Sequence, residues 1–150
     1  MRLWGDPQVT RFIASRALDA SQVHERLARE MDTQRTCGMQ YWPVFLRADG
    51  AFVGCCGLRP RAQAPDEPEF GVHLLPLRWG QGHAMEAASC VIDHAFGAGG
   101  HRALFAGHHP DNLASRRLLA RLGFVHTHDE CYPPTGLMHP SYRLSRSVGT

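Results

Sequence analysis

The stretch Arg78-Trp79-Gly80-Gln81-Gly82-His83-Ala84 decides the fold of this chain. It follows a predicted strand, 69–74, and leads directly into a predicted helix. Its two closely spaced glycines allow a tight turn with no side chain above it. The first amides of the helix lack intrahelical acceptors, and the helix dipole adds partial positive charge there. Strand, glycine turn and helix N-terminus together form an anion site, and the predicted anion is a phosphate or pyrophosphate.

A lone Gly-x-Gly also fits a simple connection between a strand and a helix. Evidence from the rest of the chain is therefore needed to choose between such a connection and an anion site. The 150 residues are 43% hydrophobic and 20% charged, which indicates one globular domain over 1–150. A formal net charge of +2 gives no argument for a nucleic-acid partner. Five irregularly spaced cysteines disfavour a disulfide framework. With no membrane-spanning apolar run and no secretory signal, we expect a cytoplasmic protein without a membrane partner.

Two helices are predicted before the first strand. Asp6-Pro7 places an N-cap residue before a proline at the first helical position. Asp19 and Gln22 have the spacing of a capping box, and Gly38 ends the second helix. Apolar residues recur every four positions in that helix and predict its buried stripe, Val23, Leu27 and Met31. The residues off this stripe are predicted to face solvent: Arg26, Arg29 and Glu30.

The ranges 41–47 and 51–58 are predicted as a hairpin of two strands, turning at Asp49-Gly50. Pro43 is typical of an edge strand or a bulge because it has no N–H to donate. Gly54-Cys55-Cys56-Gly57 predicts a closely packed strand. Its adjacent cysteines point to opposite faces, and such cysteines rarely serve one metal.

The strand 69–74 is predicted to place Glu69, Gly71 and His73 on one face. The helix after the glycine turn has a stripe of mostly small residues, which lets a helix lie close to a sheet: Ala84, Ala87, Ala88, Val91 and Ala95. A further strand is predicted over 102–107. The helix that follows starts with Asp111 or Asn112 as N-cap and has the buried stripe Ala114, Leu118 and Leu122.

The C-terminal part is predicted as a strand, 124–128, a Pro-rich loop, 131–140, and a last strand, 141–145. Helices therefore alternate with strands along most of the chain. This order predicts an α/β domain with a mixed sheet.

Two segments resemble the GNAT N-acetyltransferases. The stretch 80–87, Gly-Gln-Gly-His-Ala-Met-Glu-Ala, resembles their acyl-CoA pyrophosphate loop. Asn112-Leu113-Ala114-Ser115, followed by Gly123-Phe124, resembles the helix beside the CoA thiol end. The pair is most similar to the RimJ/RimL-type branch, and Asp6-Pro7-Gln8-Val9 resembles a segment of that branch's first helical region. The resemblance implies a GNAT-like, strongly twisted mixed sheet flanked by helices, and an acetyltransferase that uses acetyl-CoA.

The resemblance also implies roles for single residues. The strand end should bind the pantetheine arm through its main chain, the loop amides should hold the pyrophosphate, Asn112 should contact the pantetheine arm, and Ser115 should lie near the thioester sulfur. The cofactor-binding residues implied are His73, Leu74, Leu75, Trp79, Gly80, Gln81, Gly82, His83, Ala84, Asn112 and Ser115.

Three features depart from the family pattern. Trp79 stands where the wider superfamily has Gln or Arg, although Trp is familiar there in the RimJ/RimL-type branch. Leu119 stands where many members carry a tyrosine acid, so that acid is absent. The chain also lacks a counterpart of the family's first strand, and Met1 falls inside what would be its first helix. We therefore expect a bare sheet edge, which invites a homodimer or a covering N-terminal segment.

Acetyl transfer from a thioester to an amine needs a neutral amine and a leaving thiolate that is stabilised or protonated. An alkyl ammonium, with a pKa of about 10, must first lose a proton, directly or through water. Glu69 is the predicted base, although a solvated strand carboxylate fits its position equally well. Ser115 is predicted to donate to the sulfur, or to bond its own helix. His73 is the alternative base, and His128 and Glu130 rank lower.

Two other classes of function stay open. His126-x-His128-x-x-Cys131, with His108-His109, offers ligand types suited to Zn²⁺, but the spacing matches no strong zinc pattern. The second class is a protein with a GNAT-like fold that binds CoA without transferring acetyl. The acceptor, a protein N-terminus or a small-molecule amine, is left undecided, because the loops predicted on the substrate side, 33–40, 62–68 and 129–140, carry no dominant charge.

Overall fold

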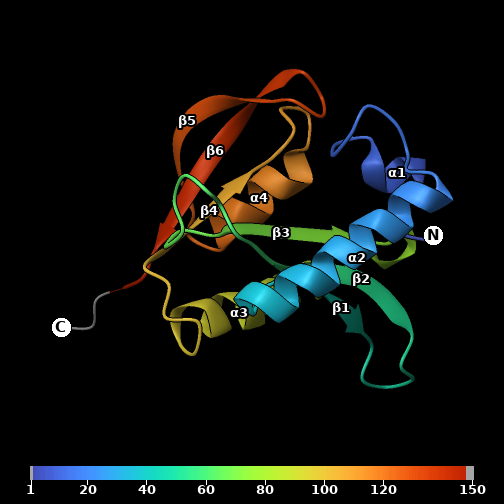
Figure 1. The fold of residues 1–150 in the computed structure, drawn as a ribbon, viewed down its shortest axis with the longest axis horizontal. Coiled ribbons are helices and arrows are strands. Elements are labelled where there is room, and N and C mark those ends of the chain that lie inside the picture. The colour runs from blue at the N-terminus through green and yellow to red at the C-terminus, as the bar shows by residue number, and fades with distance from the viewer. Residues whose placement is uncertain (1, 148–150) are drawn as a thin grey trace.

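The computed structural model describes residues 2–147, in which helices lie on both sides of one six-stranded sheet (Figure 1). The helices are α1 (Pro7–Thr10), α2 (Ala20–Cys37), the 3₁₀ turn η1 (Pro76–Arg78), α3 (His83–Phe96) and α4 (Leu113–Arg121). The strands are β1 (Tyr41–Phe45), β2 (Phe52–Arg59), β3 (Glu69–Leu74), β4 (Ala103–Gly107), β5 (Val125–Tyr132) and β6 (Leu137–Ser145). None of these helices has the length and apolar character needed to cross a bilayer.

The sheet is mixed, as predicted. Its strand order is β1-β2-β3-β4-β6-β5. The neighbours β3 and β4 run parallel, and the other neighbouring pairs run antiparallel. Residues 2–40 form helices and turns but no strand, so β1 is the outer edge of the sheet. A counterpart of the family's first strand is therefore absent from the described residues.

Local signals in the sequence mark where the helices begin and end. Pro7 is the first residue of α1, after the N-cap Asp6. Asp19 and Gln22 form the predicted capping box at the start of α2, and Gly38 ends that helix in the left-handed conformation. Asn112 caps α4, which decides between the two predicted N-cap residues.

Each face of the sheet has its own apolar core. The larger core lies under α3 and α4 and contains Met39, Cys56, Leu58, Phe70, Ala88, Val91, Ala95, Leu104, Ala106, Leu119, Phe124 and Tyr142. The smaller core lies under the N-terminal residues and α2 and contains Leu3, Trp4, Val9, Val23, Tyr41, Cys55 and Leu75. The adjacent residues Cys55 and Cys56 belong to different cores, as strand alternation predicts. In α4 the buried residue is Leu119, whereas Ala114 is exposed, so the predicted stripe was wrong at that position.

The helix α2 packs a partly polar face against the sheet, which corrects the sequence prediction. Val23 is buried as predicted, but Leu27 and Met31 are 49% and 64% exposed. Glu30, predicted to face solvent, is only 4% exposed. Arg26 is also largely covered, because its guanidinium stacks over the ring of Trp4. The reason is that this face meets polar partners on distant segments, which helical periodicity does not reveal.

The outer edge of the sheet is partly closed by α2. The Glu30 carboxylate accepts a hydrogen bond from the Tyr41 N–H at 2.8 Å, on the side of β1 that faces away from β2. Pro43, two residues further along the same side, has no N–H to offer. The edge therefore offers fewer free donors than expected, and an N-terminal segment covers part of it. Pairing with a second copy stays a prediction, which light scattering can measure directly.

We expect Glu30→Gln to lower the free energy of unfolding by about 2 kcal/mol, because it removes the charge that Arg59 pairs with at 2.8 Å. The two Glu30 oxygens serve different donors, Oε2 the Tyr41 N–H and Oε1 the Arg59 guanidinium. Glutamine has one oxygen and one NH2 group, so the variant loses one of these acceptors together with the charge. The measurement is denaturant unfolding. The control is Asp32→Asn on the same helix, whose pair with Arg35 is exposed and should matter by less than about 0.5 kcal/mol. Equal effects of the two variants would contradict the prediction.

The C-terminal hairpin is longer than predicted. The strand β5 continues to Tyr132 and β6 already begins at Leu137, so only residues 133–136 form the turn. The predicted Pro-rich loop was wrong because Pro133 and Pro134 fall inside the turn, and the third proline, Pro140, lies within β6, where it is paired with Asp129. The predicted loop 33–40 is likewise mostly the last part of α2. These corrections bring Tyr132 and His139 to the face of the sheet where the site lies.

Candidate active site

A cavity of about 530 Å³ lies where β3 and β4 part. The two parallel strands share a single paired position, Glu69 with Phe105, and the Phe105 N–H donates to the Pro68 carbonyl at 3.0 Å. Beyond this point 71–74 and 106–107 diverge and line opposite walls of the cavity. The main-chain groups of β3 on that side have no partner strand, so an extended ligand can pair with them.

The glycine turn lies at one end of the cavity, which Trp79 and Ala84 line. Gly80 and Gly82 have φ of 69° and 83°, and a Cβ on either would point into open space. Glu86 is the first residue whose amide finds an acceptor in α3, the Gly82 carbonyl at 3.2 Å. The amides at 83–85 therefore lack intrahelical acceptors. The tight turn and the free donors predicted from the sequence are both present.

The other residues implied in cofactor binding separate into two groups. The Trp79 indole donates to the Leu74 carbonyl at 3.0 Å, and both residues line the cavity. Leu75 does not line it, because its amide donates to Val53 at 2.9 Å and its side chain belongs to the smaller core. Gln81 is exposed and His83 is half-buried, and neither residue lines the cavity.

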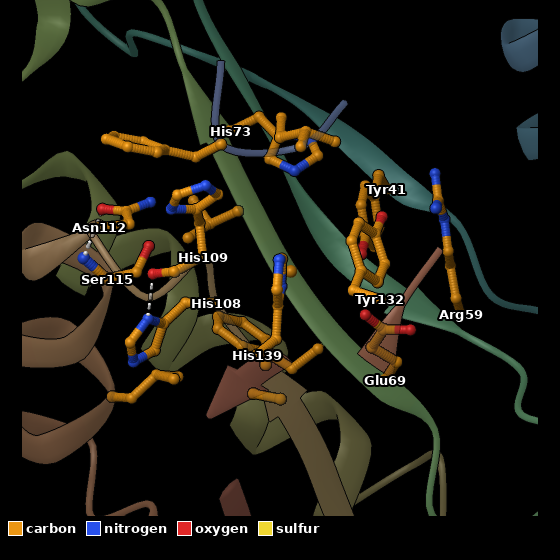
Figure 2. A pocket seen from close by; sticks show the side chains of 18 of the residues that line it. Tyr41, Arg59, Glu69, His73, His108, His109, Asn112, Ser115, Tyr132 and His139 are labelled. Carbon is orange, nitrogen blue, oxygen red and sulfur yellow. Dashed lines mark hydrogen bonds between the residues drawn. The ribbon is translucent and has the colours of Figure 1, made fainter. Parts of the chain in front are cut away.

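Asn112 and Ser115 line the cavity together at the start of α4 (Figure 2). The Asn112 side-chain oxygen accepts a hydrogen bond from the Ser115 N–H at 3.1 Å. This cap fixes both residues at the cavity wall. The Ser115 hydroxyl makes no hydrogen bond within residues 2–147, so it is free to donate to a ligand.

Glu69 lies across the cavity from Ser115, beside Tyr132 and Arg59 (Figure 2). Its carboxylate has no hydrogen bond or ion pair within the described part of the chain. Burial raises the pKa of Glu69, and the Glu130 carboxylate acts in the same direction, while the Arg59 guanidinium opposes them. A carboxylate with free lone pairs and a raised pKa is suited to accept a proton.

His73 also lines the cavity, but the structure limits what it can do. The Trp4 indole N–H points at its Nδ1 atom, 3.2 Å away. That bond uses the Nδ1 lone pair and places the ring proton on Nε2. Burial and the nearby Arg26 and Arg59 lower the pKa of His73 well below its usual value. His73 is therefore a neutral donor toward the cavity rather than a free base.

Sequence reasoning missed His139 and Tyr132. His139 is 5% exposed, its Nε2 lies 2.8 Å from the Thr135 hydroxyl, and its ring stacks on Tyr132. Burial, and then the neighbouring His109 and His108, lower the pKa of His139. Both missed residues fell inside the predicted loop. The alternation of 137, 139 and 141 along a strand is the signal that would have placed His139 on the cavity face.

The metal ligand set considered from the sequence does not come together. Within residues 2–147 no three His, Cys, Asp or Glu side chains are placed to hold a metal ion. His126 instead lies 2.9 Å from Asp129, and His128 lies 3.0 Å from Glu130. Glu130 lines the cavity, whereas His128 points outside it.

Comparison with known proteins shows the family. Residues 1–125 match the model of the acetyltransferase (GNAT) domain, so the chain belongs to the GNAT acetyltransferases. A relative from Aspergillus fumigatus, FsC-acetyl coenzyme A-N(2)-transacetylase, is 31% identical over 160 residues, covering 97% of this chain and 66% of the relative. The chain thus spans about two thirds of that relative's length.

Two solved structures confirm the fold. The acetyltransferase yncA from Salmonella typhimurium, solved with acetyl-CoA, matches with a TM-score of 0.73 and 22% identity over 95% of this chain and 84% of that one. RimJ from Mycobacterium smegmatis, in complex with CoA-disulfide, matches with a TM-score of 0.73 and 21% identity over 92% and 70%. GNAT acetyltransferases use acetyl-CoA, and the split between β3 and β4 with the glycine turn at its end fits that molecule.

Proposed function

We propose that this protein is an acetyl-CoA-dependent N-acetyltransferase that moves acetyl directly to a primary amine. One observation carries the proposal: a single cavity connects the free amides after the glycine turn with the unpaired carboxylate of Glu69. An anion site and a base at opposite ends of one cavity are what thioester transfer to an amine requires.

The geometry supports the following residues as those that would hold acetyl-CoA. The amides after Gly80 and Gly82 bind the pyrophosphate, and the unpaired main chain of 71–74 binds the pantetheine arm. Asn112 contacts the same arm, and Ser115 lies at the thiol end. When bound, acetyl-CoA supplies the thioester whose acetyl carbon gains the amine nitrogen and loses the thiolate.

Glu69 takes the proton that the acceptor ammonium must lose, directly or through water. Attack of the neutral amine leaves a second proton on the nitrogen, and this proton passes to the leaving sulfur, to which the Ser115 hydroxyl donates a hydrogen bond. Glu69 and the thiol therefore take up the two protons that the ammonium loses, and no covalent acetyl-enzyme is required.

The cysteines support direct transfer. Burial raises the pKa of Cys55 to about 12, and burial likewise raises the pKa of Cys56. A cysteine acts as a nucleophile through its thiolate, which these environments suppress. The exposed cysteines, Cys37, Cys90 and Cys131, do not line the cavity.

The test is a panel of amines incubated with acetyl-CoA, with release of free thiol as the readout. The panel contains peptides with free N-termini, as the RimJ/RimL-type branch implies, together with small-molecule amines. We expect thiol release that depends on at least one amine. CoA binding without release on any amine would favour the alternative, a CoA-binding protein that transfers nothing.

We expect Ser115→Ala to lower kcat by roughly fivefold, consistent with one hydrogen bond of about 1 kcal/mol. The loss is modest because a thiolate leaves reasonably well without help. It should shrink further with an acyl donor whose thiol is more acidic, measured by thiol release for two donors. The variant keeps its Asn112 cap, which uses the Ser115 main chain. A loss that is the same for both donors would remove the assigned role.

A further inference from the structure

The wall of the cavity contains an arginine without an anionic partner. Arg26 lines the cavity, and its guanidinium lies 4.3 Å from the ring centre of Trp4. Its Nε and Nη2 atoms are buried and find no hydrogen-bond partner within residues 2–147. The remaining nitrogen, Nη1, is not covered in this way. Arg26 therefore has one accessible donor nitrogen, and its charge forms no ion pair with any side chain of the described residues.

The carboxylate whose charge acts on Arg26, Glu30, is already in use. Glu30 accepts hydrogen bonds from Nε and Nη2 of Arg59, at 3.2 and 2.8 Å, and from the main chain of Tyr41. Burial lowers the pKa of Arg26, and the charge of Arg59 adds to this effect. A partly buried cation without an ion pair is stabilised when an anion binds next to it, because the attraction between the two charges offsets the cost of removing the cation from water.

The free cation and the free carboxylate occupy the same cavity but do not pair with each other. Arg26 and Glu69 both line it, and the charge of Arg26 acts on Glu69 without an ion pair between them. A ligand that joins an amine to an anion can therefore use both groups at once.

On the basis of the proposed function, we propose that the acceptor is a small amino acid, whose carboxylate binds Arg26 while its amine faces Glu69. A carboxylate suits the site better than a phosphate, because one accessible donor nitrogen would leave most phosphate oxygens unsatisfied. A protein N-terminus has a neutral amide where a free amino acid has its carboxylate, so it cannot use Arg26 in this way. Val9, Phe12 and Ile13 line the same cavity and offer apolar surface for the side chain.

The first arm of the test compares three forms of each acceptor, in the thiol-release assay with the unaltered protein. These are common L-amino acids, their amides, and the amines left after decarboxylation. The amine pKa is lower in the amide and higher in the decarboxylated amine than in the amino acid. A preference for the amino acid over both therefore cannot come from amine basicity. We expect kcat/KM to favour the amino acid by about 10- to 100-fold, the effect of one charge-assisted hydrogen bond.

The second arm changes Arg26. Arg26→Met keeps an unbranched apolar stem on Trp4 and removes the charge, so kcat/KM for the amino acid should fall toward the value for its decarboxylated amine. Arg26→Lys keeps a charge and should keep part of the preference, which covers the case where Arg26→Met folds poorly. The control is Arg29→Met, on the exposed face of the same helix. A purely structural arginine would lower turnover of all three forms alike, and that result would overturn the inference.

The third arm measures binding without turnover. Calorimetry on the full chain saturated with CoA compares an N-acetyl amino acid with its N-acetyl amide. We expect the acid to bind about 10- to 100-fold more tightly, with the difference lost in Arg26→Met. Selective binding of the acid with no thiol release on any amine would refute the proposed function and leave the carboxylate site standing. Thiol release that is equal for charged and neutral acceptors would refute the carboxylate site alone.

Discussion

Glu69→Gln should lower kcat by roughly 10²–10⁴, the usual contribution of a general base. Glutamine keeps the size of the side chain and removes its ability to accept a proton. The carboxylate has no structural partner within the described residues, so the substitution breaks no ion pair. CoA affinity, measured by calorimetry, should stay near normal because the anion site lies at the other end of the cavity.

The role of Glu69 as a base also predicts how activity should change with pH. Burial raises the pKa of Glu69, so activity of the unaltered enzyme should rise with pH through a midpoint above the ordinary value for a carboxyl group. The variant should lack this rise and regain rate only as the pH approaches the pKa of the acceptor amine. The control is Glu67→Gln, two residues away, whose carboxylate pairs with Arg143 outside the cavity. Equal kcat and an unaltered pH profile in Glu69→Gln would make Glu69 a structural residue.

The folding stability of Glu69→Gln distinguishes loss of the catalytic base from damage to the fold. The folded protein holds the Glu69 proton more tightly than the unfolded chain, because its folded pKa is raised. Folding stability from this group is therefore present below the unfolded pKa and is lost as pH rises through the folded pKa. Glutamine removes that loss, so Glu69→Gln should be at least as stable as the unaltered protein at neutral pH. A clear fall in stability would show that the activity loss has another cause.

Gly82→Asp should weaken CoA binding by at least about 100-fold, a loss of at least about 2.7 kcal/mol. Gly82 is the N-cap of α3, and a side chain there would enter the space in front of the free amides. The aspartate would place a negative charge where the pyrophosphate binds and offer its own carboxylate to the same amides. Calorimetry with CoA is the measurement.

A matched control exists for the backbone strain. Gly82 has φ of 83°, which an aspartate adopts only at a cost, and Gly100 has φ of 65° with equally open surroundings. Gly100→Asp carries a similar conformational cost beyond the far end of α3, away from the cavity. It should reduce stability to a similar extent and leave CoA affinity unchanged. If both variants, or neither, lose CoA affinity, the anion site is not at Gly82.

Features set by neighbours in the sequence were predicted well. Each of these features depends on a few consecutive residues: the capping box of Asp19 and Gln22, the tight glycine turn before α3, the hairpin at Asp49-Gly50 and the limits of β3. Backbone sterics and local hydrogen bonds determine these features, so a short window of sequence contains the necessary information. The two motifs also predicted the family, because both lie on such local elements.

The acceptor end of the site could not be predicted in this way. The partner of Glu30 is Arg59, 29 residues away, and the partner of Trp4 is His73, 69 residues away. Helical periodicity therefore gave α2 the wrong buried face and hid Arg26, whose surroundings come from other segments.

The sequence by itself determined the helix ends, the glycine turn and the mixed α/β order. It also determined which side chains of β3 share the face toward the cavity. Only the tertiary structure decided which polar side chains share the cavity. The β5–β6 hairpin, which the prolines in the sequence made look like a loop, places His139 at the site. The packing of distant segments leaves Arg26 without an anionic partner. The physical reason is that burial and pairing of a charge depend on every segment packed around it, whereas caps and turns depend on the chain's own next few residues.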